Sequence, residues 1–398
     1  MLRCSLMPLP LLAAAALGAP RLADAPPLPK RAATLAGFVP PGWRALGEAR
    51  GDLNGDGLAD IVAVLGSRRE ESAPADADLP PRLLLVALAG RGKGGTTAGY
   101  RRAALDQRAV FARSDGGAFG DPFADIRVER GTLALEHYGG SRERWGYTDR
   151  FRLQNGAWEQ IGRTSTSMDA FEPGRTRSRD VNLNTGRVVE TEPASGPGGG
   201  RPVTRVYHEV FAAPAGRAPQ WPPPNAPLGR RVRLAERADV VQNADVWRGP
   251  ADLAATISAA VHEGALHLRA QVRDDRVAPG DMVRVVDEKG RPVSPARTGT
   301  RTFAGGYVWQ GRYPLSALGV RPANRQTPAV GYAAASISAS VEVWDADGGG
   351  SAATDRGAVK TLSASRGGRT FPARIRLTRA ARLPRLGDPA PGAAFYSD

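Results

Sequence analysis

Cysteine, lysine and histidine are scarce in this chain of 398 residues. The only cysteine, Cys4, lies ahead of the first apolar run, where a lipoprotein cysteine does not lie, so we expect no lipid anchor. If the segment around Cys4 is removed, the mature chain has no disulfide and no thiol nucleophile. No later run of 18 apolar residues occurs, so the sequence predicts no transmembrane segment.

The N-terminus is typical of an export signal. Arg3 supplies a basic start, Leu9 to Leu17 is apolar apart from one proline, and small residues follow near Ala19 and Ala25. We therefore predict a signal peptide over residues 1–25 and an exported protein, either periplasmic or secreted.

The net charge of +14 comes almost wholly from arginine, because only four residues are lysine. The arginines are scattered among acids and form no long basic run. Nucleic-acid binders concentrate their charge on one face or arm. We therefore expect no nucleic-acid partner, although a weak attraction to an anionic envelope polymer fits the charge.

Short apolar or alternating segments separated by turn residues predict an all-β fold with two domains. The clearest hairpin turns are Arg130-Gly131, between 125–129 and 132–138, and Asn155-Gly156, between 147–154 and 157–161. The predicted organisation is a signal peptide (1–25), a leader (26–37), a small β domain (38–210), a Pro-rich linker (211–229), a β-sandwich (230–383) and a disordered tail (384–398).

One stretch, residues 51–60, has the pattern of a calcium loop. Oxygen-bearing side chains alternate along it, and Gly57 permits a sharp turn. Calcium takes six to eight oxygen ligands in flexible geometry, which such a loop can supply. The candidate ligands are the side chains of Asp52, Asn54, Asp56 and Asp60 and the backbone carbonyl of Leu58.

The residues after the loop do not fit an EF-hand. The twelfth position counted from Asp52 is Ala63 rather than Glu, and residues 61–65 favour a buried strand over a helix. From Asp52 to Leu65 the chain resembles the FG-GAP/VCBS repeats of integrin-like propellers, which implies calcium as the cofactor. Only one such loop occurs, so a full propeller is not expected. The alternative is an Asn/Asp/Gly turn that binds no metal.

The first domain also resembles a group of exported bacterial proteins of unknown function, from Phe38 to about Val210. The resemblance implies a compact domain and lends no activity. The segments that carry it are residues 38–43, 117–123, 137–141, 144–145, 151–152 and 158–162.

The second domain resembles the family 9 carbohydrate-binding modules and their DOMON-like relatives. The resemblance lies in residues 247–253, 266–275, 306–319 and 343–347. It implies a β-sandwich, and sugar-binding members hold a sugar ring between aromatic side chains. Trp309 and Trp344 are the candidate ligand-binding residues, and core packing is the alternative role for both.

Paired acids in the second domain invite a catalytic interpretation. Asp274 and Asp275 are adjacent on a predicted strand, so they point to opposite faces and make a poor acid–base pair. A turn role is better, or a second calcium site with Asp345 and Asp347. His262, Glu263 and His267 lack the helical spacing of a zinc protease motif.

These features predict an exported, non-catalytic binding protein with calcium as cofactor and a glycan or anionic envelope polymer as partner. One alternative is a hydrolase of envelope carbohydrate with its site around Asp121, Glu136 and His137. Another is a purely structural envelope protein. Two carboxylates facing each other across a cleft would favour the hydrolase, and exposed coplanar tryptophans would favour the glycan binder.

Overall fold

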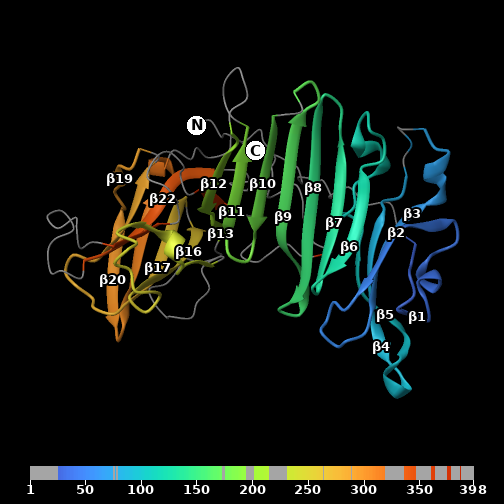
Figure 1. Ribbon diagram of the computed structural model, residues 1–398, viewed down its shortest axis with the longest axis horizontal. Coiled ribbons are helices and arrows are strands. Elements are labelled where there is room, and N and C mark those ends of the chain that lie inside the picture. Colours follow the sequence, from blue (N-terminus) through green and yellow to red (C-terminus); the bar gives the residue numbers. More distant parts are fainter. Residues whose placement is uncertain are drawn as a thin grey trace, which may run out of the picture.

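The computed structural model describes residues 26–74, 77, 79–172, 175–193, 201–214, 231–262, 264–287, 289–318, 336–346, 360–363, 374–377 and 386. Within these ranges every regular element is a strand or a short 3-10 helix. The predicted all-β fold class is therefore confirmed, and Figure 1 shows the strands following one another along the long axis of the molecule. The predicted signal peptide, residues 1–25, lies outside the described part.

The first sheet has five antiparallel strands in the order β1-β5-β4-β3-β2. Strand β3, which lies between β4 and β2, is buried on both faces, which explains why residues 61–65 form a continuous apolar run instead of an alternating one. The elements are β1 (Arg31–Ala32), η1 (Leu35–Phe38), β2 (Trp43–Gly51), β3 (Asp60–Ser67), η2 (Arg68–Glu71), β4 (Leu83–Arg91), η3 (Lys93–Gly95) and β5 (Thr97–Asp106).

The second sheet is a seven-stranded antiparallel meander in which each strand pairs with its neighbour in the chain. Both predicted hairpins are confirmed, and all four turn residues have positive φ, as two-residue loops of type I′ require. The elements are η4 (Arg113–Gly116), β6 (Phe123–Glu129), β7 (Thr132–Gly140), β8 (Glu143–Gln154), β9 (Ala157–Asp169), β10 (Thr176–Asn182), β11 (Arg187–Glu192) and β12 (Val203–His208).

Two apolar layers hold the first sheet in place. One face packs against the second sheet through residues such as Val62, Val64 and Leu133. The other face is covered by Leu28 and Leu35 of the predicted leader, together with neighbouring apolar residues. Each fully buried side chain of this size contributes roughly 1.5–3 kcal/mol, so residues 26–37 are part of the folded unit.

The remaining strands form a third, twelve-stranded assembly that folds over itself. Strand β22 belongs to both layers, because its start pairs with β24 and the rest pairs with β18. The elements are β13 (Val210–Pro214), β14 (Arg231–Leu234), η5 (Arg237–Asp239), β15 (Val240–Gln242), β16 (Leu253–His262), β17 (Ala265–Asp274), β18 (Met282–Asp287), β19 (Pro292–Val293), β20 (Arg297–Phe303), β21 (Gly306–Pro314), η6 (Leu315–Leu318), β22 (Ser336–Asp345), β23 (Lys360–Ser363) and β24 (Arg374–Leu377).

A single core fills the space between these two layers. Ile257 and Leu268 from one layer pack with Val285, Val341 and Leu362 from the other. The arrangement is the two-layer sandwich that the strand spacing predicts. Strand β13 pairs in parallel with β16 and β24, so residues 211–214 of the predicted linker belong to this sheet, and residues 215–229 lie outside the described part.

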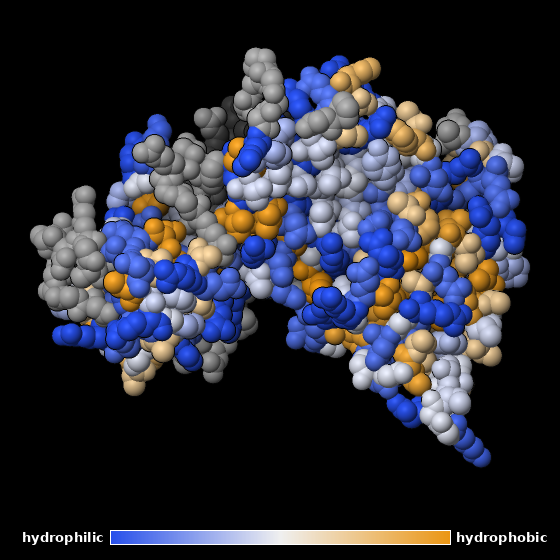
Figure 2. Space-filling model, in the orientation of Figure 1, coloured by the Kyte–Doolittle hydropathy of each residue, from blue (hydrophilic) through white to orange (hydrophobic). Residues whose placement is uncertain are grey.

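Leu386 lies within the stretch predicted to be a disordered tail, yet it packs against the first core and donates its backbone N–H to the carbonyl of Trp158 at 3.0 Å. Among the described residues, none of the helices has the length and apolar character to cross a membrane. On the face drawn in Figure 2, hydrophobic residues of the described part lie in small groups between hydrophilic ones.

Candidate functional site

The predicted calcium loop connects β2 to β3 and is closed by the pairing of Gly51 with Asp60. Gly55 and Gly57 have φ values of +81° and +82°, a conformation that side chains other than glycine rarely adopt. The two glycines therefore let the chain turn tightly enough to bring the alternating polar side chains together.

Asp52 is the organising residue of the loop. One carboxylate oxygen accepts from the backbone N–H of Asn54, Gly55 and Asp56, and the other accepts from Gly57 at 2.8 Å. The hydrogen bond from Gly57 is the main cause that lowers the pKa of the Asp52 carboxyl, and the other three add to it. The carboxyl is therefore ionised at neutral pH.

Asn54 and Asp56 meet across the loop. The Asn54 amide donates to one Asp56 carboxylate oxygen at 3.0 Å, and the other oxygen accepts the Leu58 backbone N–H at 2.8 Å. The Leu58 side chain is buried, which fixes the last turn of the loop. Arg91 donates to the backbone carbonyl of Asp56 and so braces the loop from β4.

Asp60 lies at the base of the loop and is 0% exposed. Its oxygens accept the backbone N–H groups of Leu53 and Ala89, so it joins the loop to β4. Burial raises the pKa of its carboxyl, and the negative charges of Asp56 and Asp52 add to the rise. Among the described residues, Asp52, Asp56 and Asp60 do not form a group whose carboxylate oxygens all lie within 4.8 Å of one another.

The structure does not bring the two candidate tryptophans together. Trp309 is 6% exposed and belongs to the core between the two layers. Trp344 is half-buried, and the guanidinium of Arg284 covers its ring at 4.2 Å from the centroid. On β22, Val341 and Val343 point into the core, and successive side chains of a strand point to opposite faces. Trp344, which follows Val343, therefore lies on the outer face. A sugar ring cannot be held between the two.

The residues of the hydrolase alternative are also separate. Asp121 is bound by both terminal nitrogens of Arg82 at 2.6 Å, and Glu136 by Arg127. Glu136 and His137 are adjacent on β7, so their side chains lie on opposite faces of the sheet. Each of the two carboxylates is thus paired with an arginine, which does not leave it as a free acid or base for hydrolysis.

The acids of the second domain are grouped differently from the set that the sequence predicted. Asp275 turns to Arg248 at 3.0 Å, and Asp347 lies outside the described residues. Asp274 and Asp345 instead face Asp281, a residue that the sequence reasoning did not select. In the sequence, Asp281 is marked only as an acid that directly follows the Pro279-Gly280 turn. Sequence spacing does not show which strand ends lie together, so it could not group Asp281 with the other two aspartates.

Comparison of the chain with protein-family models, with curated proteins and with solved structures finds no match.

Proposed function

We propose that the chain is an exported, non-catalytic binding protein whose loop Asp52–Asp60 binds calcium and whose partner is a glycan. The observation that carries the calcium proposal is the convergence of Asp52, Asn54 and Asp56 in one glycine turn. Export is part of the proposal through the predicted signal peptide.

The charge of the loop supports a cation. Asp52, Asp56 and Asp60 place three carboxylates within one turn, and the two outer ones act electrostatically on the buried one. The basic side chain of Arg91 contacts the loop through the backbone carbonyl of Asp56, and this hydrogen bond does not use a carboxylate oxygen. The Asp52 oxygen that accepts from Gly57 and both Asp56 oxygens each accept a single N–H and keep a second lone pair for a metal ion. The other Asp52 oxygen already accepts three. Calcium would offset the mutual repulsion and use the oxygens already gathered there.

A groove at one end of the second sheet supports a glycan partner. It has a volume of about 620 Å³ and lies where β8 and β10 begin and β9 ends. Beside it, Phe171 is 78% exposed and lies 5.5 Å from the guanidinium of Arg142. The groove holds as many acids as arginines, which suits the hydroxyl groups of a sugar better than a bare polyanion. Its lining residues are Ser141, Arg142, Glu143, Ser167, Met168, Asp169, Glu172, Arg175, Arg177 and Pro193.

Calcium titration by calorimetry tests the loop. We expect the wild-type protein to bind calcium and Asp56→Ala to lose one site per chain, because this change removes a carboxylate from the turn. The matched control is Asp125→Ala, which removes an aspartate paired with Arg127 on the outside of β6. Equal site numbers in wild type and Asp56→Ala would show that the loop is a turn that binds no metal.

A further inference from the structure

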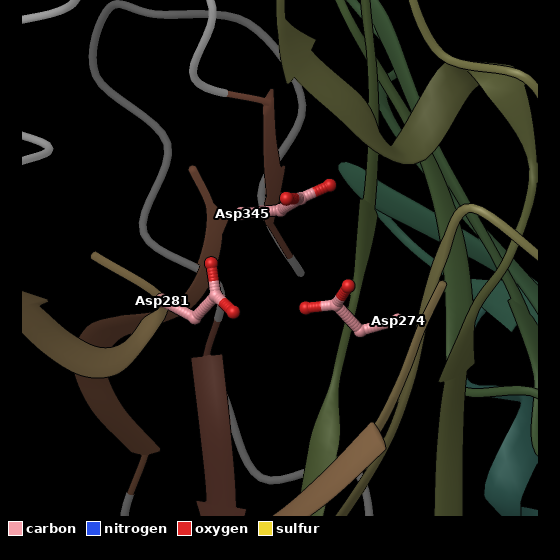
Figure 3. A group of neighbouring side chains, drawn as sticks. All are labelled: Asp274, Asp281 and Asp345. Atoms are coloured by element: carbon pink, nitrogen blue, oxygen red, sulfur yellow. The ribbon is translucent and has the colours of Figure 1, made fainter. Parts of the chain in front are cut away.

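Three aspartates from separate strand ends lie together in the second domain. Asp274 ends β17, Asp281 directly precedes β18, and Asp345 ends β22. One carboxylate oxygen of each lies within 4.8 Å of the others. Figure 3 shows the carboxyl groups of Asp281 and Asp274 turned towards each other, with that of Asp345 beside them.

These carboxylates are removed from water. Asp274 is 1% exposed, Asp345 is fully buried, and Asp281 is partly buried. Moving a carboxylate out of water is costly unless it is paired, hydrogen-bonded or bound to a metal. Three neighbouring carboxylates with so little exposure are not a solvated acidic surface, so their burial requires another explanation.

The hydrogen bonds at the cluster are incomplete. One Asp274 oxygen accepts the backbone N–H of Arg276 at 2.8 Å, and the other, Oδ2, is buried without a hydrogen-bond partner. Asp281 accepts the N–H groups of Ala278 and Ala346. The group that Oδ2 of Asp274 faces is the carboxyl of Asp281, so the two acids can be brought together only by a shared proton or a shared cation.

A second group points to the same place. Tyr307 of β21 is 3% exposed, and its hydroxyl has no hydrogen-bond partner. It pairs across the sheet with Val272, which lies on the same inner face of β17 as Asp274. Burial raises the pKa of its hydroxyl, and the charges of Asp281, Asp274 and Asp345 raise it further, so the hydroxyl lies within electrostatic reach of all three.

The nearest cationic side chain does not neutralise the cluster. Lys360 contacts Asp345 at 2.9 Å but also Asp252 at 2.7 Å, so its single charge is shared between two acids. Arg248 is taken by Asp252 and Asp275. Within the described part of the chain, these contacts place five carboxylates against two cationic side chains.

We propose that Asp274, Asp281 and Asp345 bind one divalent cation of the calcium type, with the Tyr307 hydroxyl as a further oxygen beside it. The donor set is oxygen alone, which suits a hard cation and not zinc or copper. The ion would join β17 of one layer to β18 and β22 of the other, and would hold the sandwich at this edge. This site is independent of the loop Asp52–Asp60.

The test separates the two sites by using Asp56→Ala as the background. In this full-length variant we expect one calcium ion per chain to remain bound at calcium concentrations up to about 1 mM, where extracellular calcium modules work. Adding Asp281→Asn should weaken that binding by at least ~10-fold, because it removes one of three charges at nearly constant shape. The control is Asp275→Asn, which neutralises the acid that faces Arg248 and should leave the affinity unchanged.

Terbium provides a second readout that does not depend on an altered carboxylate. A bound Tb³⁺ excited through tyrosine should emit in the Asp56→Ala background, and Tyr307→Phe should shift the tyrosine contribution to that emission downward. Circular dichroism without calcium checks that each variant is folded. Absence of any calcium binding in Asp56→Ala, or equal binding in Asp281→Asn and Asp275→Asn, would overturn the proposal.

Discussion

At the scale of single residues, the protonation of buried His137 is set by its immediate surroundings. His137 is almost completely buried, and its Nε2 accepts the backbone N–H of Phe111 at 3.3 Å. Burial lowers the pKa of His137 to about 4, and Arg163 and Arg82 push it in the same direction against Asp149. The side chain is therefore neutral at pH 7 and acts as a structural acceptor.

The depressed pKa predicts a pH dependence of stability. The unfolded chain binds a proton at His137 near pH 6.5, whereas the folded chain does so only near pH 4. Stability is therefore full above pH 6.5 and falls as the pH drops towards 4, by about 3 kcal/mol over that window. Urea unfolding of wild type and His137→Gln at several pH values measures this. Parallel curves for the two proteins would contradict the prediction.

Most other buried charges in the described part form close pairs. Arg82 lies between Glu70 and Asp121, Arg163 binds Asp149 at 2.6 Å, and further pairs obey the same rule. Removing one partner of a buried pair typically costs 3–5 kcal/mol, so pairing is the normal solution in this fold. Asp274, one oxygen of which accepts no N–H, departs from this pattern, and a cation is a partner that would complete it.

At the scale of elements, local chemistry was sufficient to predict strands and turns. The Asn155-Gly156 turn and the continuous apolar run of residues 61–65 both carry their conformation in their own side chains, and both predictions are confirmed. Asp281 could not be found this way, because its partners are seven and 64 positions away and only strand pairing joins them. Strand β13 was missed for the same reason, since its parallel neighbours are distant in sequence.

The β9–β10 connection carries the prediction for the proposed partner. Phe171 lies in the chain between Asp169 and Glu172, which both line the groove, and its exposed ring offers a face on which a sugar ring can pack. We expect Phe171→Ala to weaken binding of the best glycan from a screen by at least ~5-fold, equivalent to about 1 kcal/mol.

The control for this element is Phe303→Ala, which removes an exposed phenylalanine from β20 in the other domain. It should bind the glycan as the wild type does. If Phe171→Ala and Phe303→Ala bind the glycan equally well, the groove is not the contact surface. This conclusion does not depend on whether the loop binds calcium.

At the scale of the whole molecule, the chain builds cores that share no residues. The cores around the first sheet use residues from the N-terminal half together with Leu386, and the sandwich core uses residues from Val210 to Leu362. Separate cores predict two unfolding transitions in calorimetry, because few apolar contacts join them. Leu386 is the exception, since it comes after the sandwich in sequence and packs against the first core.

This return contact predicts that the end of the chain stabilises the beginning. Leu386→Ala should lower the stability of the first unit by about 1 kcal/mol, less than for a fully buried leucine because the side chain is only partly buried. Calorimetry should show one transition shifted down and the transition of the sandwich unchanged. Val246→Ala, which trims an exposed residue of the second domain, is the control and should shift neither. A shift of both transitions by Leu386→Ala would mean that the two cores unfold as one unit. No shift would mean that packing of the Leu386 side chain against the first core adds nothing to stability.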